Sequence, residues 1–170
     1  MQRRSRRAFL AGVAATTAGS LAGCTGALRG GGSTPSGMTV ETLSVGGSSG
    51  DTVPVQPAGT VTLLDFFATW CAPCKPQMDH LGTVRDRFPQ LHMLSITWEK
   101  DPEVVKSFWT ECEGTWPVAL DPEVRTGPEY GVDRIPTMVV LDAEGEEVWR
   151  HSGLAATDSI VEQVESARSA

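Results

Sequence analysis

The stretch VTLLDFFATWCAPCK, residues 61–75, constrains the fold of this chain more than any other segment. It begins with a run of β-branched, aliphatic and aromatic residues that is too short for a helix and predicts a buried central strand. Asp65 is the one charged residue in that run. Beyond Trp70, apolar residues recur three or four positions apart, which predicts a helix over residues 74–88. A buried strand that leads straight into an amphipathic helix indicates an α/β domain with a central sheet.

Two cysteines, Cys71 and Cys74, stand where the predicted strand gives way to the predicted helix. Unpaired backbone N–H groups and the positive end of the helix dipole favour an anion there, so we expect a thiolate at Cys71 with a pKa below the ordinary value of about 8.5. Side chains three apart at a helix start lie close enough to bridge. The spacing therefore predicts a redox-active disulfide, with Cys71 as an exposed nucleophile and Cys74 as the inner, resolving thiol. Pro73 stiffens the turn between them.

The sequence WCAPCK, residues 70–75, resembles the active site of the thioredoxin superfamily. The match extends to Asp65, which falls where thioredoxins keep a buried acid, and to residues 130–132 followed by 135–137, which resemble the cis-proline segment of that family. The resemblance implies a thioredoxin-like, three-layer α/β/α domain with a central mixed β-sheet over residues 39–170. It also implies the activity of a protein thiol–disulfide oxidoreductase that needs no cofactor.

Further roles follow from that resemblance. Cys74 releases a captured substrate once it has lost its proton, and Asp65, buried beneath it, is the expected proton acceptor. A cis peptide bond between Ile135 and Pro136 would leave the Ile135 backbone free to pair with a substrate strand, and Trp70 is expected to contact substrate beside the sulfurs. Plainer interpretations stay open: Asp65 as a structural acid, Pro136 in an ordinary trans turn, and Trp70 as a core residue.

Within the superfamily, the chain looks most like the membrane-anchored TlpA/ResA-like oxidoreductases, because of its export signal, an inserted helix that begins at Asp101 and the segment TWPVALD, residues 115–121. Members of that family commonly reduce disulfides outside the membrane, including those of apocytochromes c and copper-site proteins. We therefore expect protein disulfide substrates, a membrane electron donor and a role as reductant. In two departures, Gln77 replaces a glutamate common in that family, and Met93 is expected where thioredoxins place a lysine near the buried acid.

Residues 1–23 have the composition of a targeting segment. Arginines precede a short apolar stretch rich in small residues, and SRRAFL, residues 5–10, resembles a twin-arginine export signal. LAGC, residues 21–24, resembles a lipobox, which implies cleavage before Cys24 and lipid attachment to its sulfur. We expect residues 24–38, rich in glycine and serine, to be a flexible tether that holds the domain at the outer face of the cell membrane. An ordinary signal peptide with an incidental cysteine is the alternative.

The chain carries 14 basic and 21 acidic residues, a formal charge of −7, and loss of the leader would make it more acidic still. Such a surface repels nucleic acid and anionic lipid, so no nucleic-acid partner is expected. Because few of the basic residues are lysines, the composition suggests a salt-adapted protein, in which high ionic strength screens the self-repulsion. We expect a monomer.

The remaining pattern predicts a helix with Asp101 as its N-cap and an apolar face made of Val104, Val105, Phe108 and Trp109. Cys112, near the end of this helix, is expected to be a buried thiol that behaves as a small hydrophobe. Thr157 is expected to cap a last helix. Strands are expected at 91–97, at 118–120 as an edge piece, and at 137–141 and 146–150 as a hairpin.

Two other classes of function would use the same cysteines. A metal-binding module, for copper delivery in particular, would take Cys71 and Cys74 as half of a site, but structural zinc needs four ligands and the three histidines, His80, His92 and His151, are scattered, so no metal is expected. A structural lipoprotein with an inert disulfide is the other alternative. Its disulfide would resist dithiothreitol, whereas an active one should be readily reduced and reoxidised.

Overall fold

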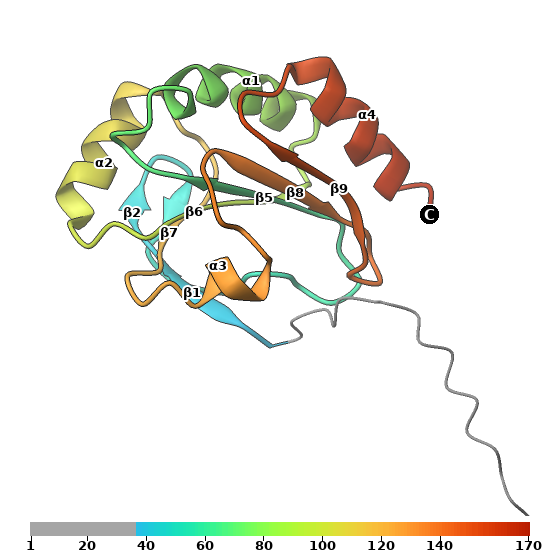
Figure 1. Cartoon of the computed structure of the whole chain (residues 1–170), viewed down its shortest axis with the longest axis horizontal. Helices are drawn as coiled ribbons and strands as arrows, with labels where there is room; N and C mark the ends of the chain where they lie inside the picture. Colours follow the sequence, from blue (N-terminus) through green and yellow to red (C-terminus); the bar gives the residue numbers. More distant parts are fainter. Residues whose placement is uncertain (1–36) are drawn as a thin grey trace, which may run out of the picture. The chain divides into compact units, whose positions relative to one another are not determined.

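The computed structural model describes residues 37–170, which form a mixed sheet with helices against its faces (Figure 1). Seven strands lie in the order β4-β1-β7-β6-β5-β8-β9, and β2 and β3 form a separate small hairpin. The strands are β1 Thr39–Thr42, β2 Ser44–Val45, β3 Ser48–Ser49, β4 Thr52–Pro54, β5 Thr62–Phe67, β6 His92–Thr97, β7 Val118–Leu120, β8 Thr137–Leu141 and β9 Glu147–Ser152. The helices are α1 Cys74–Arg87, α2 Pro102–Glu111, α3 Thr126–Glu129 and α4 Thr157–Ala167.

Several predictions fall outside the described residues. The export signal at 1–23, Cys24 and all but the last two residues of the tether at 24–38 lie there, so they stay predictions. Within residues 37–170, no helix has the length and apolar character needed to cross a bilayer.

Strand β5 lies inside the sheet, as the sequence predicts for residues 61–67, and all six of its residues are buried. It pairs in parallel with β6 and antiparallel with β8, which is also buried along its whole length. Strands covered on both faces carry continuous apolar runs rather than alternating ones, because neither face meets water. The same coverage removes water from Asp65 in the middle of β5.

Alternate residues of β5 point to opposite faces of the sheet and divide the core in two. Leu63 and Phe67 pack with residues of α1, α2 and α4 on one face. Leu64 and Phe66 pack on the other face, which α3 covers (Figure 1). Asp65 shares the face of Leu63 and Phe67 and therefore lies on the side that α1 covers. With helices on both faces of a mixed sheet, the predicted three-layer α/β/α architecture is confirmed.

One strand prediction is wrong. Residues 118–120 were expected at the edge of the sheet, but β7 lies between β6 and β1. The sheet is wider than expected because β1 pairs with β7 and β4 pairs with β1, all in antiparallel register. These first strands are short and rich in threonine, so they lack the apolar run by which the inner strands are recognised.

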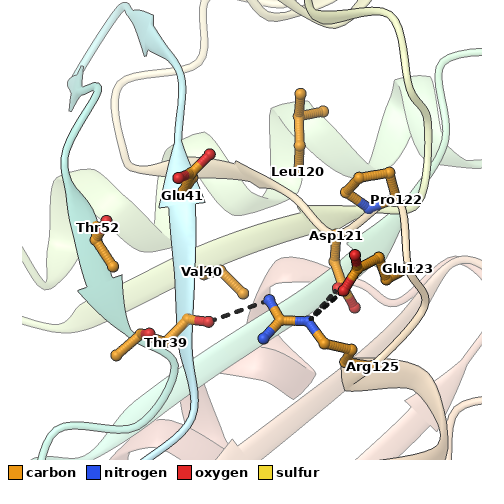
Figure 2. A pocket seen from close by; sticks show the side chains of 9 residues that line it. All are labelled: Thr39, Val40, Glu41, Thr52, Leu120, Asp121, Pro122, Glu123 and Arg125. Atoms are coloured by element: carbon orange, nitrogen blue, oxygen red, sulfur yellow. Dashed lines mark hydrogen bonds and ion pairs between the residues drawn. The ribbon is translucent and has the colours of Figure 1, made fainter.

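A pocket of about 440 Å³ lies where β1 meets the end of β7 (Figure 2). Arg125 reaches across it: its Nη2 donates to the carbonyl oxygen of Thr39 at 3.3 Å, and its Nε donates to Asp121 Oδ1 at 3.3 Å. Asp121 is fully buried and also accepts hydrogen bonds from the backbone N–H and the hydroxyl of Thr126, each at 2.7 Å. These contacts fasten the first strand of the domain to the loop after β7.

Two predicted helix details are also wrong. The N-cap of α4 is Ala156, without a side-chain bond, and the hydroxyl of Thr157 instead lies 2.9 Å from His80 Nδ1 on α1. Val104 is 45% exposed, because the core covers only the stripe formed by the other three apolar residues of α2. Asp101 caps α2 as predicted, accepting a backbone N–H at 3.0 Å.

Gly47 lies where the β2–β3 hairpin turns against the segment before β7. A Cβ atom there would lie 1.9 Å from the carbonyl oxygen of Thr115, so Gly47→Ala must push the hairpin outward. We expect this variant to lower the free energy of unfolding by about 2 kcal/mol in urea denaturation. Gly82→Ala in α1 is the matched control, because nothing lies within 4 Å of its Cβ position and alanine favours a helix by about 1 kcal/mol. If Gly47→Ala proved as stable as Gly82→Ala, this close packing would be refuted.

Candidate active site

A disulfide joins Cys71 and Cys74 in the turn between β5 and α1. The two sulfurs lie 2.09 Å apart and the two Cα atoms 5.3 Å apart. The backbone N–H of Cys74 donates to the carbonyl oxygen of Cys71 at 3.0 Å, which closes a tight turn over Ala72 and Pro73. The spacing that suggested a bridge in the sequence is thus a bonded pair in the structure.

The cysteines sit differently at the helix start than expected. Helix α1 begins at Cys74 with Pro73 as its N-cap residue, so Cys71 precedes the first turn. Cys71 is only 6% exposed and packs into the core with Cys74, which is 2% exposed, so it is not the exposed residue that we expected. It is still the more accessible of the two. The first turn of α1 contains no acidic residue, so no carboxylate there competes with a thiolate for the positive end of the helix.

Asp65 lies on the face of the sheet that α1 covers and is 3% exposed. Its Oδ2 accepts a hydrogen bond from the Ser95 hydroxyl at 2.8 Å. Its Oδ1 is buried and, among the described residues, has no hydrogen-bond partner. Burial raises the pKa of Asp65 to about 7, and the Ser95 bond lowers it by a smaller amount. A carboxyl group with this pKa can both accept and release a proton near neutral pH.

Ser95, not Met93, is the residue of β6 that lies beside Asp65. The parallel register of β5 and β6 places Ser95 directly opposite Asp65 and Met93 opposite Leu63. Ser95 Oγ also accepts a hydrogen bond from the indole N–H of Trp116 at 2.9 Å. The register, which the sequence pattern does not fix, therefore gives the buried acid a neutral hydroxyl partner.

A groove of about 340 Å³ lies beside the dithiol turn, with Trp70 and Ile135 in its walls. Trp70 is 76% exposed, so the alternative of a core residue is wrong. The Ile135–Pro136 peptide bond is cis. The other residues that line the groove are Phe67, Ala68, Thr97, Trp98, Glu99, Asp133 and Arg134. An apolar side chain next to the disulfide of a partner protein could bury its surface here.

Glu99 is a site residue that the sequence analysis missed. Its carboxylate accepts two hydrogen bonds from Thr69, one from the backbone N–H at 2.8 Å and one from the hydroxyl at 2.7 Å. This double contact fastens the turn before Cys71 to the end of β6. A signal was present: an acidic residue follows the predicted strand at 91–97, and the carboxyl ends of parallel strands meet at one edge of a sheet.

Gln77 fastens the other end of the dithiol turn. It is 1% exposed, its Oε1 accepts from the backbone N–H of Ala155 at 2.8 Å, and its Nε2 donates to the Ala155 carbonyl at 3.3 Å. The first turns of α1 are thereby tied to the loop before α4. Gln77 is thus a neutral side chain whose amide oxygen and nitrogen both bond the backbone of Ala155.

Cys112 is half-buried at the end of α2 and free, rather than buried as expected. Burial raises the pKa of its thiol, and nearby Lys75 lowers it by a smaller amount. Lys75 itself pairs with Glu111 at 2.5 Å. The Cys112 thiol is therefore protonated at neutral pH, which makes it a poor nucleophile.

The three histidines contact different parts of the domain: His80 bonds Thr157, His92 bonds the Val55 carbonyl, and His151 bonds the Leu154 carbonyl. In the part of the chain that the structure describes, no three side chains from His, Cys, Asp and Glu are grouped to hold a metal ion.

Several known proteins are similar to this chain in sequence or in fold. A family model described as Redoxin matches residues 35–166, which include both cysteines. The thiol:disulfide interchange protein HelX of Rhodobacter capsulatus is 25% identical over 108 residues, 63% of this chain and 60% of HelX. The thiol-disulfide oxidoreductase ResA of Bacillus thuringiensis is 26% identical over 92 residues, 53% of each chain. The chain thus spans between about half and three fifths of the length of these curated relatives.

Solved structures support the same fold. The exposed lipoprotein thioredoxin Etrx1 from Streptococcus pneumoniae superposes with a TM-score of 0.65 at 21% identity, over 76% of this chain and 98% of Etrx1. Together with the sequence relatives, this structure confirms the predicted thioredoxin-like fold and the resemblance to TlpA/ResA-like proteins.

Asp65 should make the stability of the protein depend on pH. Its pKa rises from 3.8 to about 7 on folding, so between these values the folded protein keeps a proton that the unfolded chain has released. The free energy of unfolding therefore falls as pH rises from about 4 to about 7, by up to about 4 kcal/mol from this group, and levels off above. Asp65→Asn removes this titration.

Urea denaturation of wild type and Asp65→Asn at pH 5 and pH 8 measures the effect, because the other titrating groups cancel in the difference. We expect the stability of the variant relative to wild type to rise by a few kcal/mol between the two pH values. A difference that does not change with pH would contradict a raised pKa for Asp65.

Proposed function

Because the chain belongs to the Redoxin family, we propose that it is an exported, lipid-anchored thiol–disulfide oxidoreductase that exchanges disulfides with extracytoplasmic proteins through Cys71 and Cys74. The observation that carries this proposal is the Cys71–Cys74 disulfide at the start of α1, on the same face of the sheet as a buried acid whose pKa lies near neutrality. The matched relatives are longer than the shared region, so the activity of the whole protein is part of the proposal.

In the first step, the Cys71 thiolate attacks a disulfide of the substrate protein. A mixed disulfide forms between Cys71 and one substrate sulfur, and the other substrate sulfur leaves as a thiolate. The nearby helix N-terminus stabilises the attacking anion, and exposed Trp70 with half-buried Ile135 offers a surface on which the substrate strand can lie. Pro136, joined to Ile135 by the cis bond, is buried behind this surface.

In the second step, Cys74 must lose its proton before it can attack. Asp65 takes that proton through a bridging water, and the Cys74 thiolate attacks the Cys71 sulfur. The Cys71–Cys74 disulfide forms, and the second substrate sulfur leaves as a thiolate. The substrate gains two electrons and this protein loses two, so a membrane dithiol donor must reduce the pair again.

The proposed direction is reduction, and the proposed substrates are disulfide-bearing proteins outside the membrane, including apocytochromes c and copper-site proteins. The names of HelX and ResA describe thiol–disulfide exchange, and Etrx1 is described as an exposed lipoprotein. A twin-arginine signal at residues 1–23 and a lipid on Cys24 would place this domain at the outer face of the cell membrane. The acidic composition fits a monomer that does not bind nucleic acid.

The two cysteines should fail in different ways when each is replaced. Cys71→Ser removes the nucleophile and should abolish reduction of insulin disulfides, whereas Cys74→Ser should accumulate mixed disulfides that survive on non-reducing gels. Cys112→Ser is the matched control and should keep full activity, because its thiol is outside the pair. Full activity of Cys71→Ser would refute the assigned roles, and a wild-type disulfide that resists dithiothreitol would favour an inert structural bridge.

Asp65→Asn should slow the second step and spare the first. In stopped-flow measurements at pH 7, we expect the resolving step to slow by about 10²-fold or more, because a general base is lost, while the attack of Cys71 changes little. Equal loss in both steps would point to a structural role for the acid.

A further inference from the structure

Trp116, Ser95 and Asp65 form a buried chain of hydrogen bonds from three separate segments of the sequence. The Trp116 indole N–H donates to Ser95 Oγ at 2.9 Å, and the Ser95 hydroxyl donates to Asp65 Oδ2 at 2.8 Å. These side chains are 1%, 0% and 3% exposed, respectively. Buried polar groups depend on such bonds, since water cannot replace them.

The indole limits how Ser95 can bond to Asp65. An indole nitrogen can only donate, so Ser95 Oγ accepts at that contact with one of its two lone pairs. Of the two positions left for the Ser95 hydrogen, the one toward Asp65 Oδ2 is the only one that meets an acceptor among the described residues. A proton placed on Oδ2 would therefore leave the Ser95 hydrogen buried without an acceptor.

This leaves Oδ1 as the oxygen that takes up a proton. It is buried, and within residues 37–170 it has no hydrogen-bond partner. We propose that Trp116 and Ser95 are positioning residues that reserve Asp65 Oδ1 for the proton of Cys74. The inference rests on the proposed function, because it concerns the same transfer: the proton of the Cys74 thiol reaches Oδ1 through the bridging water, the Cys74 sulfur bonds to Cys71, and the substrate leaves as a thiolate.

The surroundings of Asp65 make this chain its main polar contact. Met138 of β8 lies opposite Asp65 in the sheet, and the core residues that α1, α2 and α4 contribute on this face are uncharged. The Cys71 and Cys74 sulfurs belong to the same cluster and are bonded to each other, so neither titrates in the oxidised protein, and the half-buried thiol of Cys112 packs against the cluster. Among the described residues, no charged side chain shifts the pKa of Asp65, which burial raises and the Ser95 bond lowers.

Two substitutions interrupt the chain of bonds without adding bulk. Ser95→Ala removes the hydroxyl that stabilises the ionised carboxylate, so the pKa of Asp65 must rise. We expect its infrared carboxyl band in the oxidised protein, and the rate of the resolving step, to titrate about one pH unit higher. In Trp116→Phe the Ser95 hydroxyl is free to turn and accept a proton from the carboxyl, so we expect a smaller shift in the same direction.

Trp109→Phe is the matched control. Trp109 is also fully buried and packs edge-on against Trp116 with ring centroids 5.0 Å apart, and its indole N–H has no acceptor in the described part of the chain. It loses the same atoms from the same core, so its titration should stay that of wild type. Ser95→Thr keeps a hydroxyl at the same place and should restore the wild-type midpoint.

Unchanged titration in Ser95→Ala or in Trp116→Phe would overturn the inference, as would an equal shift in Trp109→Phe, which would assign the effect to core packing. Should Trp116→Phe fail to fold, the titration midpoints of Ser95→Ala and Ser95→Thr test the role of Ser95: equal midpoints in these two variants would overturn the inference. The proposed function fails separately: a wild-type protein that exchanges no protein disulfides would overturn it, even where the infrared titration still follows Ser95. If the wild-type protein is active but Ser95→Ala and Trp116→Phe do not shift the titration of Asp65, only the positioning roles of Ser95 and Trp116 are overturned.

Discussion

The exclusion of water from one carboxyl group, Asp65, is the constraint on which the site depends. The group stands in the middle of a strand whose every residue is buried, on the face of the sheet where α1 and the two cysteines pack. Burying a carboxyl group costs free energy unless it is neutral or paired, and here one oxygen is bonded while the other has no partner among residues 37–170. A fold selected for stability alone would favour an apolar residue at this position, which is why the proposed function gives the acid a chemical role.

Two polar contacts hold the dithiol turn between rigid elements. Glu99 binds Thr69 on the side of β6, and Gln77 binds Ala155 on the side of α4. The two cysteines of the turn pack into the core, and these hydrogen bonds fix the chain on either side of them. Packing and hydrogen bonds together thus define the position of the sulfurs.

The elements with long apolar runs could be predicted from the sequence. Strands β5, β6 and β8 and helices α1 and α2 lie close to their predicted limits, because burial on both faces leaves a continuous apolar run and burial along one stripe leaves a strong periodic pattern. Strands β1 and β4 could not be predicted, since they are short and rich in threonine. The cysteine pair, with its spacing before a helix, was visible in the sequence.

The partners of the site residues were harder to predict than the residues themselves. The sequence identifies Asp65 but not Ser95, because the neighbour of an acid across a sheet depends on register, and the pattern of β6 allows more than one. Glu99 and Gln77 look like ordinary polar residues until the fold brings Thr69 and Ala155 to them.

The burial of the Cys71–Cys74 disulfide affects which thiols can reach it. With Cys71 only 6% exposed, a small thiol in solution meets little of the bond, whereas a protein surface that settles against Trp70 can align its own sulfur over a long contact lifetime. Under the proposed function, we expect the pair to react faster with a docking protein than with a small thiol at the same concentration, although a small thiol such as dithiothreitol still reduces it.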